Sequence, residues 1–412
     1  MSKYGLIGAV LGHSYSKLIH EALGNSDYSY FELTPQALED FFARREFRGV
    51  NVTIPYKVDA MRLCDEVSAE ARAIGCVNTV VNRGGRLFGF NTDAYGLSYM
   101  IRNAKITLEG KKVLILGSGG TSRTARYVAS VQGASQTVVI SRSGEDNYQN
   151  ISRHFDADVI INATPVGMYP NMDASPVSLD GFKRLSGVLD VIYNPSQTDL
   201  LFEARERGIA RSNGLIMLVA QARRAHELFF DTELEDAVID RVTSALALSS
   251  QSIVLTGMPG VGKSTLGKLL AARLGLEFVD TDKLVERDTG TAIPDFIAQH
   301  GEPCFRDAET RALASATGEG RRVIATGGGA ILREENRKLI GRNAIVLGLD
   351  APDERLVCEG RPLSSGVGAI QRLRQTRNEL YHRVADLMLV TSTDPLQTLS
   401  DALALLKVSS DR

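Results

Sequence analysis

The 412-residue chain has few cysteines, almost no net charge and no long apolar run. Its four cysteines (Cys64, Cys76, Cys304 and Cys358) form no C-x-x-C pair, so we expect reduced thiols and neither a disulfide framework nor a structural zinc site. The net charge of −2 gives no electrostatic indication of a nucleic-acid or membrane partner. Because no run approaches about 18 apolar residues and the N-terminus has no h-region, we expect a cytoplasmic protein.

The length is sufficient for two or three domains, and short apolar runs alternate with helical stretches along the whole chain. This alternation predicts the α/β class with parallel sheets. Strands are predicted at residues 4–9, 49–54, 77–82, 112–116, 137–141, 159–162 and 188–192. A helical pattern over residues 215–248 closes the first half, and the polar residues 249–252 are predicted to be a linker, with the main boundary at 247–251. The composition does not indicate an oligomeric state.

Residues 257–265, Gly-Met-Pro-Gly-Val-Gly-Lys-Ser-Thr, match the phosphate-binding loop pattern G-x-x-x-x-G-K-[ST]. The loop follows an apolar run at 253–255 and precedes a helical stretch at 266–274. In that setting backbone N–H groups wrap phosphates, Lys263 reaches the outer phosphates, and Ser264 offers its hydroxyl to Mg²⁺. The second half is therefore predicted to be a P-loop domain that binds ATP with Mg²⁺. The expected nucleotide contacts are Gly260, Val261, Gly262, Lys263, Ser264 and Thr265.

A second glycine-rich turn, Gly-Ser-Gly-Gly at residues 117–120, lies between an apolar strand and a helical stretch. A helix N-terminus aimed at such a turn is a pyrophosphate site in a doubly wound fold. The next strand ends in Ser-Arg-Ser at 141–143. An enzyme that uses NAD typically has a carboxylate at this place, which bonds the ribose 2′-OH. An arginine between two hydroxyls instead favours the 2′-phosphate of NADP. The structural alternative is an ordinary βα turn with a solvated arginine. The expected dinucleotide contacts are Gly117, Ser118, Gly119, Gly120, Thr121, Ser141, Arg142 and Ser143.

Four polar clusters in the first half stand where strands are expected to end, which is where sites form in such sheets. They are His-Ser-Tyr-Ser at 13–16, Asn-Val-Thr-Ile-Pro-Tyr-Lys at 51–57, Gly-Cys-Val-Asn-Thr at 75–79 and Gly-Phe-Asn-Thr-Asp at 89–93. Taken singly, each also has a structural explanation as hydroxyl caps, a surface lysine or turn-forming Asn and Asp.

Taken together, these strings resemble the shikimate dehydrogenase family, in family order across residues 4–225. The resemblance continues as G-x-G-G at 117–120, N-A-T-P-x-G-M at 162–168, D-x-x-Y-N-P at 190–195 and N-G-x-x-M-L-x-x-Q-A at 213–222. It implies a substrate domain formed by residues 1–102 with 213–248, and a Rossmann NADP domain over 103–212.

The resemblance implies NADP-linked reduction of 3-dehydroshikimate to shikimate, with Lys57 and Asp93 as the catalytic pair. As hydride reaches the C3 carbonyl carbon, the oxygen gains negative charge, and an ammonium held by a carboxylate can supply both charge and proton. Ser14 and Ser16 would hold the ring carboxylate. The remaining implied contacts are Thr53, Asn78, Tyr193 and Gln221 at the ring, and Val191 and Gly214 near the nicotinamide.

The chain departs from the family pattern at several positions. Lys17, Glu21 and Asn213 replace the usual proline, asparagine and aspartate. Asp146 stands where the 2′-phosphate cluster often carries a basic residue, which weakens the preference for NADP, while serine at position 16 favours shikimate over the bulkier quinate. Two alternatives stay open: a quinate dehydrogenase fused to a kinase, and a regulatory module that binds NADP or shikimate without turnover.

Beyond the phosphate-binding loop, a predicted strand ends in Asp280 and Asp282, which would share a face at the strand period of two. Further on, Arg306 and Glu309 stand one helical turn apart, and a predicted buried strand ends in three glycines at 327–329. Arg-Pro-Leu at 361–363 precedes a Gly- and Ser-rich segment at 364–368 that is predicted to be a mobile lid, and a helix with R-x-x-x-Y follows at 377–381.

This series resembles shikimate kinase over residues 252–392; gluconate and adenylate kinases share the loop but not the whole series. The resemblance implies that Asp280 and Ser264 hold Mg²⁺ and that Asp282 orients or deprotonates the attacking 3-OH. The substrate carboxylate would be clamped by two planar guanidiniums. The other implied residues are Arg306 and Arg377 for that clamp, Gly328 against the ring, and Lys263 with Arg361 for the charge of the transferred phosphoryl group.

The two resemblances therefore point to one shared molecule, shikimate, which the first half would make and the second half would consume. The sequence predicts a bifunctional α/β enzyme with a dehydrogenase over residues 1–248 and a P-loop kinase over 252–412. The expected ligands are NADP(H), ATP with Mg²⁺, 3-dehydroshikimate and shikimate.

Overall fold

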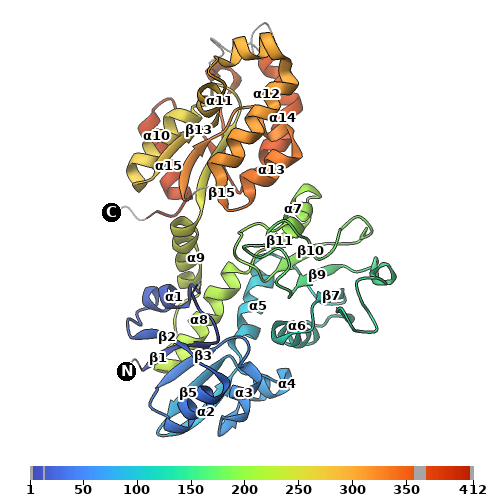
Figure 1. Ribbon diagram of the computed structural model, residues 1–412, viewed down its shortest axis with the longest axis vertical. Helices are drawn as coiled ribbons and strands as arrows, with labels where there is room; N and C mark the ends of the chain where they lie inside the picture. The colour runs from blue at the N-terminus through green and yellow to red at the C-terminus, as the bar shows by residue number, and fades with distance from the viewer. Residues whose placement is uncertain (1–2, 13, 319, 357–367, 409–412) are drawn as a thin grey trace. The chain divides into compact units, whose positions relative to one another are not determined.

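The computed structural model describes residues 3–12, 14–318, 320–356 and 368–408 (Figure 1). Contacts divide the chain into two compact units, one of residues 1–193 with 209–243 and the other of residues 194–208 with 244–412. Each unit has its own hydrophobic core, and three sheets in all are formed by the described residues.

The first sheet of the first unit has six strands in the order β2-β1-β3-β5-β6-β4. Its middle strands β1 and β3 run parallel, and β5 runs antiparallel to both β3 and β6. The strands are β1 (Tyr4–Gly8), β2 (Tyr28–Glu32), β3 (Gly49–Val52), β4 (Glu66–Val67), β5 (Thr79–Arg83) and β6 (Arg86–Phe90). The helices of this region are α1 (Ser16–Ala22), α2 (Pro35–Arg44), α3 (Lys57–Arg62) and α4 (Ala69–Ile74).

The second sheet of the first unit has five parallel strands in the order β11-β10-β9-β7-β8. The chain passes from β7 to β8 on one side and returns to β9 on the other, so the order reverses between β7 and β9, where such sheets bind ligands. The strands are β7 (Lys112–Leu116), β8 (Gln136–Ile140), β9 (Val159–Asn162), β10 (Gly187–Asp190) and β11 (Ala210–Ser212). Helix α6 (Gly120–Val131) follows β7, and a short 3-10 helix η1 (Ile151–His154) precedes β9.

Two long helices, α5 (Thr92–Asn103) and α8 (Leu215–Phe230), pack against each other in the first unit (Figure 1). The single helical pattern predicted over residues 215–248 is in fact two helices. Asp231 ends α8 in the left-handed conformation, with φ 53°, and α9 (Ala237–Ser250) begins after a short connection. Because α9 runs to Ser250 and β12 starts at Ser252, only Gln251 of the predicted polar linker lies outside a helix or strand.

The second unit contains a five-stranded parallel sheet in the order β13-β14-β12-β15-β16, with helices on both of its faces (Figure 1). Every residue of its central strand β12 is buried, as expected for a strand covered on both faces. The strands are β12 (Ser252–Gly257), β13 (Glu277–Asp280), β14 (Arg322–Ala325), β15 (Ala344–Asp350) and β16 (Leu387–Val390). The main helices are α10 (Lys263–Leu274), α11 (Thr281–Thr289), α12 (Ile293–Gly318), α13 (Glu334–Gly341), α14 (Ala369–Val384) and α15 (Pro395–Leu405); α7 (Asp199–Glu206) is grouped with this unit.

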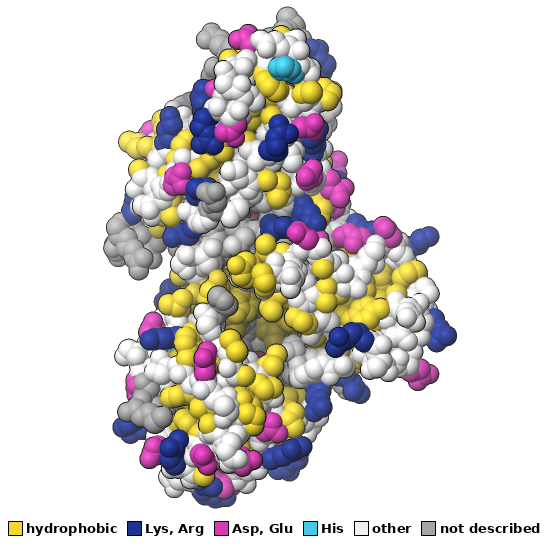
Figure 2. Space-filling view, in the orientation of Figure 1, with side chains coloured by type: hydrophobic (Ala, Val, Ile, Leu, Met, Phe, Trp, Pro, Cys, Tyr) yellow, Lys and Arg dark blue, Asp and Glu magenta, His cyan; other side chains and the backbone are white. Residues whose placement is uncertain are grey.

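The surface carries charges of both signs. Figure 2 shows Lys and Arg side chains interspersed with Asp and Glu on the visible face, without a broad field of one sign, in keeping with the net charge of −2. In the part of the chain that the structure describes, no helix combines the length and apolar character needed to span a membrane.

The close packing of α5 on α8 depends on Gly96, because an added Cβ would lie 2.6 Å from the Met217 carbonyl oxygen and 3.0 Å from Gln221 Cβ. We predict that Gly96→Ala lowers the free energy of unfolding of the first unit by about 1–3 kcal/mol, the usual cost of overpacking. Urea denaturation followed by circular dichroism measures this loss. The matched control is Gly12→Ala, where an added Cβ meets nothing within 4 Å. Equal losses in both variants would contradict the packing argument.

Candidate active sites

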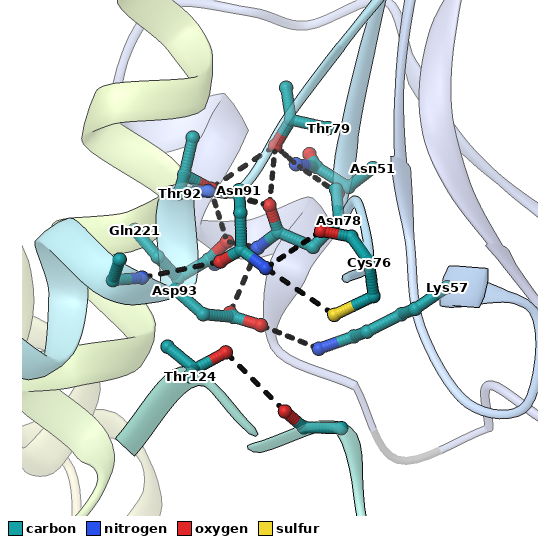
Figure 3. Close-up of polar contacts among 12 residues, drawn as sticks. Asn51, Lys57, Cys76, Asn78, Thr79, Asn91, Thr92, Asp93, Thr124 and Gln221 are labelled. Atoms are coloured by element: carbon teal, nitrogen blue, oxygen red, sulfur yellow. Dashed lines mark hydrogen bonds and ion pairs between the residues drawn. The ribbon is translucent and has the colours of Figure 1, made fainter. Parts of the chain in front are cut away.

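Lys57 and Asp93 form an ion pair in the first unit, with 2.6 Å between Lys57 Nζ and Asp93 Oδ2 (Figure 3). Lys57 is the first residue of α3, just beyond β3, and Asp93 lies in the first turn of α5. The two side chains are only 15% and 12% exposed, so little water screens their attraction. An ammonium held in this way can donate a proton to an oxygen that gains negative charge.

The position of Asp93 follows from the start of α5. Asn91 caps this helix by accepting a hydrogen bond from the Ala94 N–H, and its amide donates to the Cys76 carbonyl. A carboxylate in the first turn is favoured by the partial positive charge of the helix N-terminus. The helix start therefore fixes the position of Asp93.

Asn78 and Gln221 complete this cluster. Asn78 Nδ2 donates to Asp93 Oδ1 at 2.8 Å, so both oxygens of the carboxylate are engaged. Gln221, on α8, accepts from Asn78 Nδ2 at 3.5 Å and donates to the Leu218 carbonyl at 2.8 Å. Four residues predicted from the sequence thus lie in direct contact, although they come from different elements.

The other predicted substrate residues lie at the carboxyl ends of strands. Ser14 and Ser16 follow β1 and contact each other, with 3.0 Å between their hydroxyl oxygens. Thr53 directly follows β3 and is half-buried. Tyr193 follows β10, lies against Tyr15 with 5.4 Å between ring centroids, and has a pKa raised by burial.

The glycine turn between β7 and α6 has the geometry of a phosphate cradle. Gly117 adopts φ +101°, and an added Cβ there would lie 2.9 Å from Thr164 Cγ2 at the end of β9. Gly119 precedes α6 without a side chain over the first-turn N–H groups, and an added Cβ would meet nothing within 4 Å. A Cβ on Gly120 would lie 3.9 Å from Lys57 Cδ, so the turn opens beside the Lys57–Asp93 pair. These residues fit a dinucleotide.

Two other parts of the predicted dinucleotide site are the segment after β8 and the contact between Gly214 and Val191; the first is exposed at Arg142 and the second is closely packed. Arg142, after β8, is exposed. Asp146, which stands where a basic residue is often found, contacts His154, with 2.8 Å between its Oδ1 and Nε2 of the histidine. Gly214 packs against the backbone of Val191, because an added Cβ would lie 2.0 Å from the Val191 carbonyl oxygen.

In the phosphate-binding loop of the second unit, the lysine contacts the loop backbone and the serine hydroxyl contacts Asp280. Lys263 Nζ donates to the carbonyls of Gly257 and Met258, at 2.8 and 3.0 Å. Ser264 Oγ donates to Asp280 Oδ2 at 2.6 Å. A hydroxyl and a carboxylate at this distance are the hard oxygen ligands that suit Mg²⁺ beside phosphates.

Asp280 and Asp282 do not alternate along one strand, as the sequence pattern predicted. Asp280 is the last residue of β13, and Asp282 is in the first turn of α11. Asp280 Oδ1 caps that helix by accepting from the N–H groups of Asp282 and Lys283. Both carboxylates therefore line one cavity, as predicted, but because Asp280 caps the helix that carries Asp282 and not because the two residues alternate along a strand.

That cavity, of about 330 Å³, is lined by all the substrate-binding and Mg²⁺-binding residues predicted for the second half. Arg306 Nη1 donates to Glu309 Oε2 at 2.8 Å, and Arg377 Nη1 donates to the Gly328 carbonyl at 3.1 Å. The predicted residues that line it are Ser264, Asp280, Asp282, Arg306, Gly328 and Arg377. Arg361 lies outside the described residues, as does most of the predicted lid.

Close backbone approach explains the three glycines after β14. An added Cβ on Gly327 would lie 2.6 Å from carboxylate oxygens of both Asp282 and Glu309, and one on Gly329 would lie 2.3 Å from Arg306 Nη1. Any side chain here would fill the cavity or displace the guanidinium.

The sequence did not assign roles to Glu309, Glu302 and Tyr381. Glu302 Oε1 accepts from Arg306 Nη2 at 2.9 Å, and the Tyr381 hydroxyl donates to the Gly328 carbonyl. Burial raises the pKa of Glu309, an effect that the Arg306 charge opposes. The signal that could have found them is helical spacing, because these residues stand three or four positions from Arg306 or Arg377.

The chain matches two family models, the shikimate dehydrogenase substrate-binding domain over residues 6–80 and shikimate kinase over residues 259–407. The NADP(+)-dependent shikimate dehydrogenase of Clostridium perfringens strain SM101 is 33% identical over 267 residues, which are 60% of this chain and 98% of that protein.

Solved structures agree with the match to shikimate dehydrogenase. Shikimate dehydrogenase 1 from Peptoclostridium difficile has 36% identity and a TM-score of 0.55, covering 60% of this chain and 99% of that one. A chorismate mutase/shikimate 5-dehydrogenase fusion protein from Clostridium acetobutylicum has 36% identity and a TM-score of 0.56, covering 59% and 96%. The shikimate 5-dehydrogenase of Thermus thermophilus, solved in complex with NADP(H) and shikimate, has 31% identity and a TM-score of 0.54, covering 60% and 99%.

The first part of the chain thus has the sheets, the glycine turn and the relatives of an NADP-dependent dehydrogenase, and the second part has a nucleotide-binding kinase domain. The chain belongs to the shikimate dehydrogenase family, carries a shikimate kinase domain after it, and is a bifunctional enzyme of the shikimate pathway with both activities.

Proposed function

We propose that the first unit reduces 3-dehydroshikimate to shikimate with NADPH and that the second phosphorylates the 3-OH of shikimate with ATP and Mg²⁺. The observation that carries the first half is the 2.6 Å Lys57–Asp93 pair beside the glycine turn. The direction of the first reaction is supported by the second activity, because shikimate is what a shikimate kinase consumes.

In the first reaction Lys57 would serve as the general acid. The glycine turn at residues 117–120 would hold NADPH, which would supply the hydride for the C3 carbon of the ketone. Lys57 Nζ donates its proton to the C3 oxygen, and the neutral amine then regains a proton from water. Asp93 holds the Lys57 ammonium in place through their ion pair.

Substrate orientation would come from the remaining contacts of the first unit. The paired hydroxyls of Ser14 and Ser16 are suited to the ring carboxylate, since both can donate hydrogen bonds to it. The residues proposed at the ring hydroxyls are Thr53, Asn78, Tyr193 and Gln221. Arg142, between Ser141 and Ser143, would face the 2′-phosphate of NADP, and Val191 with Gly214 would face the nicotinamide.

In the second reaction Asp282 would orient the attacking 3-OH and accept its proton, while Arg306 and Arg377 bind the carboxylate of shikimate. All three line the same cavity, which supports this assignment. Ser264 would bind Mg²⁺ directly and Asp280 through water, where the ion would neutralise phosphate charge. Lys263 and Arg361 would stabilise the charge on the phosphoryl group in transfer.

Replacement of Lys57 tests the proposed acid. We predict that Lys57→Ala lowers kcat for NADPH oxidation with 3-dehydroshikimate by about a hundredfold or more, because a positioned general acid contributes about 10²–10⁴-fold. ATP-dependent phosphorylation of shikimate by the same chain should not change. Lys183→Ala, at an exposed lysine of the same unit, is the matched control. Retention of more than about a third of the wild-type kcat in Lys57→Ala would refute the role.

Replacement of Asp282 tests the kinase assignment. Asp282→Asn keeps the shape but removes the proton acceptor, so we predict about a hundredfold lower kcat for ADP release in the presence of shikimate. Asp288→Asn, at an exposed aspartate of the same helix α11, should be close to wild type. If both variants lose activity equally, the effect belongs to the helix and not to the carboxylate.

A further inference from the structure

Behind the Lys57–Asp93 pair lies a buried row of polar side chains that the proposed mechanism does not use. Asn51 on β3 and Thr79 on β5 are 5% and 0% exposed, and His20 on α1 is fully buried beside them. Figure 3 shows Asn51 and Thr79 linked through Asn78 to Asp93. Buried polar groups are costly unless they are hydrogen-bonded, and each side chain of this row has at least one partner, although His20 Nδ1 has none among the described residues.

The orientation of the Asn78 amide is fixed by backbone chemistry. Asn78 Oδ1 lies 2.7 Å from the Thr92 backbone nitrogen, which can only donate, so this atom must be the oxygen. Its Nδ2 must then face Asp93, to which it donates at 2.8 Å.

The orientation of Asn51 is fixed in the same way. Its Nδ2 faces the Asn78 backbone carbonyl at 3.4 Å, a group that can only accept, and donates to Thr79 Oγ1 at 3.0 Å. Having accepted from Asn51, the Thr79 hydroxyl lies 3.1 Å from Asn78 Oδ1, to which it can donate, and 3.1 Å from Thr92 Oγ1, which can itself be the donor in that contact.

The far end of the row is fixed by His20 and Tyr28. Asn51 Oδ1 accepts from the Tyr28 hydroxyl at 2.8 Å and lies 3.1 Å from His20 Nε2, which must therefore carry a hydrogen. Burial, with the nearby His226, lowers the pKa of His20 to about 3, so the ring is neutral at neutral pH. One path of hydrogen bonds, each donated in the direction of Asp93, thus leads from His20 through Asn51, Thr79 and Asn78.

We propose that Asn51 and Thr79 are positioning residues of the dehydrogenase reaction. They hold the Asn78 amide so that it donates to Asp93, and this hydrogen bond keeps the carboxylate turned toward Lys57. The inference rests on the proposed roles of Lys57 and Asp93. Hydrogen bonds in a chain of one direction polarise each other, so loss of the Thr79 hydroxyl weakens the bond at Asp93 even though Asn78 keeps its contact with Thr92.

The direct test compares Thr79→Val with Thr79→Ser in the full chain. Valine keeps the shape of threonine without the hydroxyl, and serine keeps the hydroxyl. We expect Thr79→Val to lower kcat for shikimate oxidation by NADP⁺ about five- to tenfold, the effect of one hydrogen bond, and Thr79→Ser to stay within about twofold of wild type. The KM for NADP⁺ and the kinase activity should stay unchanged in both. Equal kcat values in the two variants would overturn the proposal.

A double-mutant cycle separates positioning from a general structural effect. If Thr79 acts through Asn78, adding Thr79→Val to Asn78→Ala should lower kcat by less than about twofold further. The same five- to tenfold loss in both backgrounds would overturn the proposal. Thr79→Ala, which also lacks the hydroxyl, replaces Thr79→Val in both comparisons if the valine variant does not fold.

Lys57→Ala, measured in the same experiment, distinguishes failure of the positioning role of Thr79 from failure of the proposed dehydrogenase function. If Lys57→Ala is inactive and Thr79→Val equals wild type, only the positioning role is wrong. If Lys57→Ala is active, the proposed function itself fails.

Discussion

The proposed dehydrogenase site depends on one short ion pair held away from water. Lys57 and Asp93 come from different helices, and each is placed by a separate local cause: the turn after β3 for the lysine and the Asn91 cap of α5 for the aspartate. Their 2.6 Å contact lies where α5 packs against α8 and where β3 pairs with β5. The geometry of the proposed catalytic pair therefore depends on tertiary packing within the first unit as well as on local sequence.

The second unit is proposed to bind the same substrate, but with charged side chains where the first unit has hydroxyls. Its cavity has two guanidiniums, of Arg306 and Arg377, and two carboxylates, of Asp280 and Asp282. Before any substrate carboxylate enters, Arg306 is held by Glu309 and Glu302, so it is oriented and partly neutralised. We therefore propose that the shikimate carboxylate is bound at two sites, by neutral hydroxyls in the first unit and by guanidiniums in the second.

Features carried by contiguous residues could be predicted from the sequence. The phosphate-binding loop at 257–265 and the glycine turn at 117–120 are local patterns with a local physical cause, and the structure has both between a strand and a helix. Lys57 and Asp93 could also be named, because each stands in a short motif.

Features that depend on partners distant in the chain could not be predicted. No local pattern shows that Asp231 ends α8, or that Asp282 begins a helix instead of continuing a strand. The row from Asn51 to Asp93 joins residues up to 42 positions apart, and only the pairing of β3 with β5 brings them together.

The proposed presence of two shikimate sites in one chain is tested most directly by calorimetric titration of the full-length protein with shikimate, without NADP⁺ or ATP, so that no turnover occurs. The account predicts two molecules bound per chain, with one lost in Arg306→Ala and the dehydrogenase activity kept. A single molecule per chain, or loss of both on this substitution, would contradict it.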